Sequence, residues 1–263
     1  AAHQDFLDPT ISRFDREIQF YIAWLDLTQR LQLAGLDFCL PDIQPDTKDV
    51  SGSASFDLAL AIKLVGEGQE VVCNDFELAG SERVVVVTGP NQGGKTTFAR
   101  AFGQMHYLAR LGLSVPGTQA RLLLCDGIFT HFERQEDIAD LRGKLKDDLV
   151  RMHEILEGAT DRSILVVNEI FSSTAHQDAV LLSRALAERI LQRGLICVWV
   201  TFIDELAALG DQAVSMVSEM APDSPDERTY KIVRRPADGL AYARSVARKH
   251  GLTAEMIQDR LKP

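Results

Sequence analysis

Hydrophobic residues recur along the chain in two patterns, one helical and one typical of buried strands. Near the N-terminus, apolar spacing predicts one amphipathic helix over residues 11–34, which Gly35 can end. The residues that carry this spacing are Phe14, Ile18, Tyr21, Leu25 and Leu31. The polar stretch Pro41–Ser53 contains two prolines and a glycine, and it predicts a loop or linker.

Short apolar runs without polar alternation predict strands that are buried on both faces. Helical stretches separate these runs, and strand–helix–strand order indicates right-handed crossovers and a parallel sheet, hence an α/β fold. Such strands are expected at residues 83–87, 163–167 and 195–200, with short β-like runs at 121–125 and 128–132 and 228–234 as a candidate for a further strand. The helices are expected at 95–111, 136–156 and 178–193, with two short C-terminal helices broken at Gly251.

A glycine-rich segment follows the first of these strands and opens a helix. It reads Gly-Pro-Asn-Gln-Gly-Gly-Lys-Thr over residues 89–96 and matches the P-loop pattern G-x-x-x-x-G-K-[ST]. Its backbone amides can curl around phosphate oxygens, Lys95 can reach the β- and γ-phosphates, and Thr96 can ligate Mg²⁺. The sequence therefore predicts binding of ATP with Mg²⁺ by Gly89, Pro90, Asn91, Gln92, Gly93, Gly94, Lys95, Thr96 and Thr97.

The second half of the predicted site follows the strand at 163–167. Glu169 lies just past this strand, where ligands bind at the edge of a parallel sheet, and we expect it to act as general base. Asn168 stands where an aspartate would normally help to hold Mg²⁺, and it can contribute only a neutral amide oxygen. The sequence therefore predicts a catalytic pair of Glu169 and Lys95, with Asn168 contacting the metal through water and turnover being slow.

These segments together resemble the ATPase domain of the MutS family. The Pro-Asn pair within residues 87–97 resembles T-G-P-N-x-G-G-K-[ST], and residues 126–130 resemble D-R-I-F-T. Residues 168–174 are similar to D-E-x-x-x-x-T, and the segments 237–242 and 250–252 are similar to the family's C-terminal helices. The resemblance covers about residues 75–261, with the segments in family order.

The resemblance implies an ABC-type ATPase that dimerises and couples nucleotide state to conformational change on DNA. Its D-loop positions would be Ser172, Ser173 and Thr174, facing a partner subunit. In the segment 141–146, Lys144 replaces the family's signature serine and is either a cationic finger toward the partner or a solvated lysine. Phe202 replaces the family's switch histidine and cannot hydrogen-bond a phosphate.

Bulk properties fit a large soluble domain. The chain has 263 residues, of which 46% are hydrophobic and 25% are charged. We expect an N-terminal helix and linker over 1–45, either the stub of a connector domain or packed on the core, and the ATPase domain over 46–263. Cys39, Cys73, Cys125 and Cys197 form no C-x-x-C pair, which predicts a reducing, cytoplasmic setting.

The formal net charge of −10 argues against this segment as the main DNA-contacting surface, so DNA is expected to contact regions outside it. His131, His153 and His176 lack the spacing of a metal cluster, and Trp24 and Trp199 are expected in the core. Two alternatives stay open: a nucleotide-gated dimerisation switch that barely hydrolyses ATP, and an ABC-type ATPase coupled to a partner other than DNA. Phe56 or Phe76 is a candidate for contact with adenine.

Overall fold

The computed structural model describes residues 8–132, 143–221, 224–237, 252–254 and 256–257. Within these residues the fold is built on a six-stranded sheet in which five neighbouring strands are parallel and the edge strand β12 is antiparallel. In spatial order the strands are β12 (Ser224–Arg234), β11 (Ala213–Ala221), β5 (Val84–Thr88), β10 (Ile196–Val200), β9 (Ile164–Asn168) and β8 (Ile128–Phe132).

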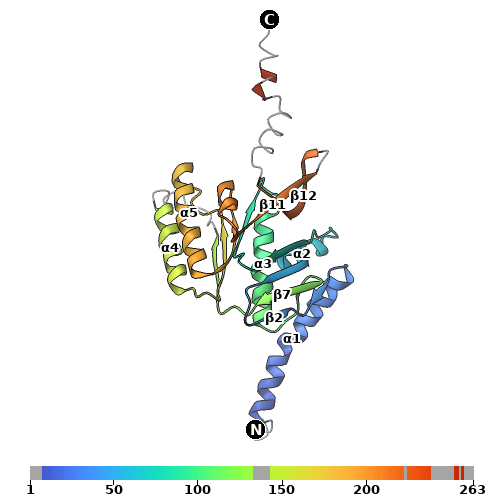
Figure 1. Ribbon diagram of the computed structural model, residues 1–263. Coiled ribbons are helices and arrows are strands. Elements are labelled where there is room, and N and C mark those ends of the chain that lie inside the picture. Colours follow the sequence, from blue (N-terminus) through green and yellow to red (C-terminus); the bar gives the residue numbers. More distant parts are fainter. Residues whose placement is uncertain (1–7, 133–142, 222–223, 238–251, 255, 258–263) are drawn as a thin grey trace.

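A second sheet packs on the other side of helix α3 (Lys95–Arg110). Its order is β2 (Asp42–Gln44), β7 (Gln119–Leu123), β3 (Val50–Ser55) and β4 (Asn74–Leu78). A short antiparallel pair joins β1 (Phe38–Cys39) to β6 (Val115–Pro116). Figure 1 shows α3 lying between the two sheets, with helices α4 (Lys144–Gly158) and α5 (His176–Arg193) on the opposite face of the larger one.

The valine run of β5 explains this layering. All four valines are fully buried, and strand geometry sends alternate side chains to opposite faces. Val85 and Val87 join the core around α3, whereas Val84 and Val86 join the core beneath α4 and α5. The prediction of an α/β fold with a mixed, largely parallel sheet flanked by helices is therefore confirmed.

The prediction of a loop over Pro41–Ser53 is wrong, because β2 and β3 occupy most of it. β3 pairs with β4 and with β7, so tertiary pairing overrides the polar local composition. Gly52 is required there because a Cβ would lie 2.5 Å from the Phe76 ring. Helix α2 (Leu58–Gly66), β4, the 3₁₀ turn η1 (Asp204–Ala208) and β11 had no counterpart among the predicted elements.

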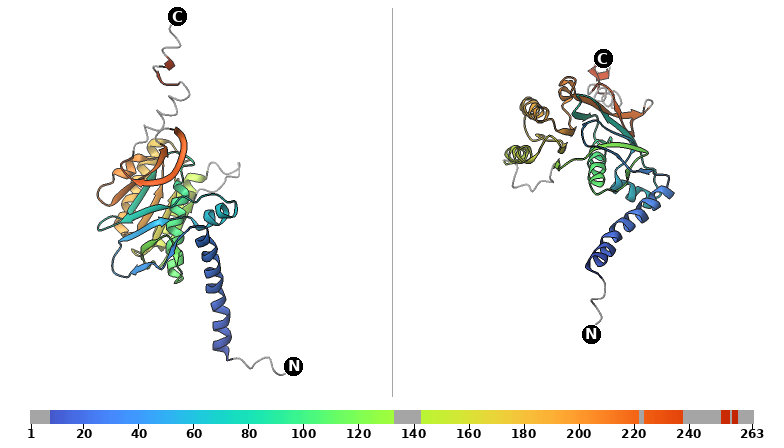
Figure 2. Two further views of the ribbon diagram at one scale, coloured as in Figure 1. Left: turned by 90° about the vertical axis from the view of Figure 1, so that its right-hand side faces the viewer. Right: turned by 60° about the horizontal axis from the view of Figure 1, so that its bottom comes forward.

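The predicted N-terminal helix is α1 (Pro9–Leu33), which begins at the Asp8 cap and ends before Gly35. Only its C-terminal part packs on the domain, through Trp24, Thr28 and Leu31. Its first half extends away from the body, as both views of Figure 2 show, and leaves Phe14 exposed.

Cys125, Cys197 and Trp199 are buried as expected. The expected start of the helix at residue 136 and most of the two C-terminal helices lie outside the described residues. In the part of the chain that the structure describes, no helix is both long and apolar enough to span a membrane.

Candidate functional site

The turn over residues 89–94 connects the buried end of β5 to the start of α3. Gly89 (φ +119°) and Gly94 (φ +90°) adopt left-handed conformations that favour glycine, and Gln92 is held at φ +60°. A Cβ on Gly93 would lie 2.1 Å from Ser218 Oγ, which itself donates to the Gly93 carbonyl at 2.7 Å. The neighbouring strand β11 therefore leaves room for backbone alone on this side of the turn.

Lys95 is the first residue of α3, and its side chain is buried beneath the turn. Its Nζ donates to the carbonyls of Gly89 and Pro90, both at 2.9 Å, and lies 4.6 Å from the centre of the Phe202 ring. Burial lowers the pKa of Lys95, while the nearby Glu169 charge acts in the opposite direction. The ammonium group thus sits among carbonyl oxygens and an aromatic face, at the N-terminal end of a helix.

Thr96 and Asn168 meet across the carboxyl ends of the parallel strands. Thr96 Oγ1 donates to Asn168 Oδ1 at 2.8 Å, and Asn168, the last residue of β9, is buried. Both groups are neutral oxygen donors, the ligand type that Mg²⁺ accepts in proteins. Their contact joins the start of α3 to the strand that precedes Glu169.

Glu169 follows β9 in a strained backbone conformation. Its φ is +54°, and that of Phe171 is +62°, values that are uncommon for residues other than glycine. The Glu169 amide donates to the Val200 carbonyl at 2.9 Å, so the residue is still anchored to the sheet. Glu169 lines the same pocket as the turn.

This pocket has a volume of about 420 Å³. The turn and the first residues of α3 form one wall, with Glu169 beside them, and the rest comes from α2, the segment between α2 and β4, the start of β4, and β12. Its lining residues are Leu60, Leu64, Gln69, Glu70, Val72, Asn74, Asn91–Thr97, Glu169 and Tyr230. A site of this size and composition suits an organic ligand with an anionic end.

Tyr230 is a pocket residue that sequence reasoning missed. It has φ +57° within β12, and the Asn74 side chain hydrogen-bonds to the backbone at Tyr230 and just after it. Asn74 Nδ2 donates to the Tyr230 carbonyl at 3.1 Å, and Asn74 Oδ1 accepts from the Ile232 amide at 2.7 Å. β4 and β12 belong to different sheets and meet only through tertiary packing, so no local signal marks these residues.

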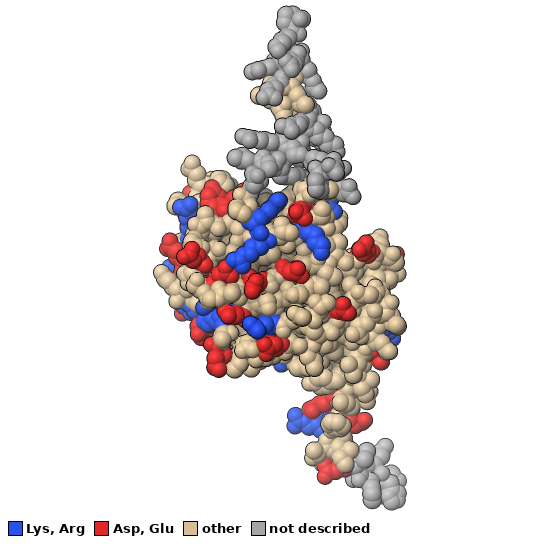
Figure 3. Space-filling view, turned by 45° about the vertical axis from the view of Figure 1, so that its right-hand side comes forward, with Lys and Arg blue, Asp and Glu red and all other residues tan. Residues whose placement is uncertain are grey.

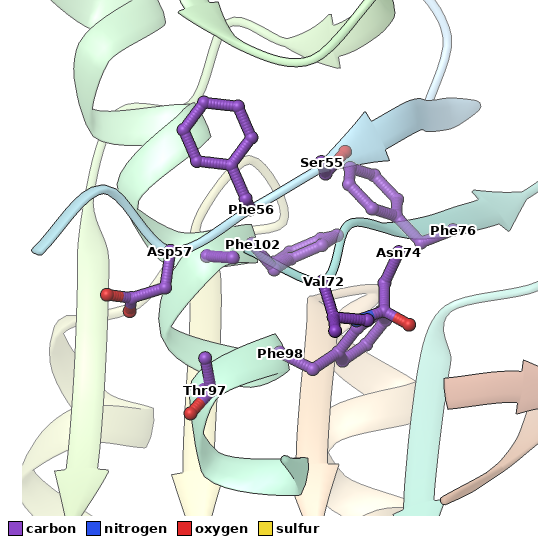
Figure 4. Close-up of a pocket in the computed structure, with 10 residues that line it drawn as sticks. Ser55, Phe56, Asp57, Val72, Asn74, Phe76, Thr97, Phe98 and Phe102 are labelled. Atoms are coloured by element: carbon purple, nitrogen blue, oxygen red, sulfur yellow. The ribbon is translucent and has the colours of Figure 1, made fainter. Parts of the chain in front are cut away.

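Phe56 and Phe76, the candidates for adenine contact, do not line this pocket. Both are buried around a neighbouring cavity of about 20 Å³, shown in Figure 4, into which Ser55 and Thr97 also reach. That space is sufficient for about one water molecule and too small for a base. Tyr230 is the aromatic residue that the larger pocket offers.

The remaining predicted residues do not line the pocket. Lys144 begins α4, Ser172 and Ser173 are exposed in the loop after Glu169, and Thr174 is half-buried. Phe202 is half-exposed beside Lys95, and His176 begins α5 at the surface. Residues 141–142 lie outside the described part of the chain.

Comparison with known proteins shows the ancestry of this arrangement. Residues 85–260, well over half of the chain, match the family model described as MutS domain V. The chain belongs to the MutS family. The match to MutS domain V includes the 89–94 turn, the Asn168–Glu169 pair and Tyr230, so most of the pocket lies within the shared region.

Individual MutS proteins agree with this assignment. The chain is 29% identical over 192 residues to the DNA mismatch repair protein MutS of Thermotoga maritima, covering 72% of the chain and 24% of that relative. It is 31% identical over 189 residues to MutS of Thermus thermophilus, covering 71% and 23%. For MutS of Desulfovibrio desulfuricans the values are 30% over 246 residues, 90% and 26%. The chain thus spans about a quarter of the length of these relatives.

Proposed function

We propose that this MutS-family chain binds ATP with Mg²⁺ and hydrolyses it slowly, as a P-loop ATPase module of the ABC type. The observation that carries the proposal is the pocket itself. Its wall is the backbone of the 89–94 turn at the N-terminus of α3, with Lys95 and Glu169 beside it. Backbone amides and a helix N-terminus together favour anions, and a phosphate chain is the anion that fits a glycine-rich turn.

The buried ammonium would stabilise the phosphates as a fixed charge. Lys95 Nζ is already at the turn, held by the carbonyls of Gly89 and Pro90. A phosphate oxygen offers stronger, charge-assisted hydrogen bonds than these neutral carbonyls. Binding would therefore exchange carbonyl contacts for phosphate contacts without moving α3.

The oxygen pair of Thr96 and Asn168 fits a magnesium ion. The Thr96 hydroxyl would ligate Mg²⁺, and the Asn168 amide oxygen would accept a hydrogen bond from Thr96 or from a water on the ion. When bound, Mg²⁺ supplies positive charge that stabilises negative charge on the phosphates. Because Asn168 brings no charge of its own, metal affinity and turnover are expected to be low.

Glu169 would orient and deprotonate the attacking water. It lines the pocket together with Thr96, follows Asn168 in the chain and carries a charge that acts on Lys95. The adenine ring of the ligand would contact Leu60, Val72 and Tyr230, which offer apolar and aromatic surface in the pocket. The triphosphate and the adenine ring would thus contact different residues of the pocket.

We further propose that the nucleotide state is coupled to a homodimer and, through regions outside this chain, to DNA in repair or recombination. The relatives' name, DNA mismatch repair protein, supports the coupling. Lys144 and the exposed Ser172 and Ser173 are the candidate contacts with a partner subunit. Figure 3 shows acidic and basic side chains interspersed on the face it presents, and the net charge of −10 fits DNA contact elsewhere.

A second candidate function is a nucleotide-gated switch with little hydrolysis. It is favoured by the placement of Phe202, whose ring faces Lys95 Nζ at 4.6 Å. Phe202 has no polar group with which to sense a phosphate, and Asn168 has no charge with which to hold the metal. Both features slow chemistry without preventing binding.

Two variants test the proposal. Lys95→Ala should abolish binding of Mg-ATP, measured by calorimetry, whereas Lys146→Ala, at an exposed lysine of α4, should bind like the wild type. Glu169→Gln should retain binding and lose steady-state phosphate release. Undiminished ATP affinity in Lys95→Ala would refute the site. Turnover of the wild type no faster than that of Glu169→Gln would leave the switch as the function.

A further inference from the structure

One carboxylate, that of Asp148, connects helix α4 with β8 and with the loop after β9. Asp148 extends from α4, and its Oδ1 lies 3.1 Å from Nε2 of His131 on β8. Its Oδ2 accepts a long hydrogen bond, 3.4 Å, from the backbone amide of Phe171 in the loop after β9. The side chains of His131 and Asp148 are only 4% and 12% exposed, so water screens these contacts weakly.

The loop that receives this contact is the one that carries Glu169. Its backbone runs through two left-handed residues, Glu169 and Phe171, separated by Ile170. Such conformations persist when the surroundings hold them in place. Val200 holds the loop at the Glu169 amide, the core beneath α4 and α5 holds the Phe171 ring, and Asp148 holds the Phe171 amide.

We propose that Asp148, oriented by His131, is a positioning residue that fixes the loop so that the Glu169 carboxylate faces the phosphate end of the pocket. The inference rests on the proposed ATPase function, because it assigns a role relative to Glu169. Asp148 itself does not line the pocket, so it acts through the loop backbone.

His131 supports this role by fixing the carboxylate. When its Nε2 donates to Asp148, the neutral ring leaves Nδ1 as an acceptor, and among the described residues this buried Nδ1 has no hydrogen-bond partner. The ring is therefore anchored through one atom, and that atom contacts Asp148. One carboxylate oxygen is thereby occupied, and the other is left for the Phe171 amide.

The test compares three variants in the full chain. Asp148→Ala should lower kcat for ATP hydrolysis by roughly tenfold to a hundredfold, since small displacements of a catalytic group have effects of this size. Its affinity for Mg-ATP should stay within about twofold of the wild type, because the 89–94 turn and Lys95 are untouched. Asp148→Asn keeps a carbonyl oxygen for the Phe171 amide and should recover most of the turnover.

Asp147→Ala is the matched control. Asp147 is an exposed neighbour in the same turn of α4, so the variant removes an equal charge without touching the loop. It should hydrolyse ATP like the wild type. Asp148→Ala turning over like Asp147→Ala, or losing ATP affinity in parallel with kcat, would overturn the assignment.

A measurement that does not depend on catalysis tests the anchoring of the loop separately from the proposed ATP hydrolysis. Amide hydrogen exchange at Phe171 should accelerate in Asp148→Ala and remain unchanged in Asp147→Ala. Unchanged exchange in Asp148→Ala means that Asp148 does not hold the loop, whatever the activity. If exchange responds as expected while the wild type shows no turnover, the proposed hydrolysis fails and the anchoring of the loop stands.

Discussion

At the scale of single residues, Asn168 determines the charge next to the Thr96 hydroxyl. An aspartate there would fit the same space and bring a negative charge to the oxygen pair. Asn168→Asp should lower the Mg²⁺ concentration needed for half-maximal ATP binding by about fivefold, because a charge-assisted contact contributes about 1 kcal/mol more than a neutral one. A magnesium titration of ATP binding measures this, and an unchanged midpoint would place the metal away from Asn168.

Lys95 provides a second prediction, on pH. Burial lowers the pKa of Lys95 below its ordinary value of 10.5, so the unfolded chain holds this proton more tightly than the fold does. Stability linked to Lys95 should therefore rise with pH, from the lowered folded pKa up to about 10.5. The free energy of unfolding of the wild type minus that of Lys95→Met should increase between about pH 8 and about pH 10. A decrease over this range would contradict the assignment.

At the scale of elements, the packing of β3 against β4 depends on Gly52, which has no side chain. Gly52→Ala should lower the free energy of unfolding by about 1–3 kcal/mol, because its Cβ would overlap the Phe76 ring in a packed core. Gly66→Ala is the control, since among the described residues no atom beyond its chain neighbours and its own helix backbone lies within 4 Å of its Cβ position in α2, and alanine favours helix there. Denaturant unfolding of the two variants should shift in opposite directions, and equal shifts would argue against close packing at β3.

Which elements could be predicted from sequence follows from how each is buried. Strands β5, β9 and β10 are buried along their whole length, so their apolar runs mark them directly. Strands β3 and β4 carry mixed patterns and exist through pairing with each other and with β7. Local composition cannot show such pairing.

The candidate site divides in the same way. The 89–94 turn, Lys95, Thr96, Asn168 and Glu169 follow buried strands and could be located from the sequence. Ser218 and Tyr230 reach the site only through the pairing of β11 with β5 and of β12 with β11, and Asn74 reaches it from β4 of the second sheet. Asp148 reaches the loop after β9 from a helix whose register is set by core packing.

At the scale of the whole molecule, the two ends of α1 differ in burial, because the C-terminal end packs on the domain and the N-terminal end is exposed. Leu31→Ala, at the packed end, should lower the free energy of unfolding by about 2–5 kcal/mol through loss of buried volume. Phe14→Ser, at the exposed end, should change it by less than about 0.5 kcal/mol. Chemical denaturation of both variants measures this, and a large loss in Phe14→Ser would mean that the first half of α1 is covered in solution.

Helix α3 is enclosed by one sheet on each side, and its first two residues supply the ammonium and hydroxyl groups of the pocket. Because core packing holds α3 on both sides, these two groups have the same positions with and without a ligand. Ligand binding therefore costs little conformational entropy at these two residues. Ligand binding should therefore leave the first turn of α3 in place, and a structural response to the ligand is expected at the other residues that line the pocket.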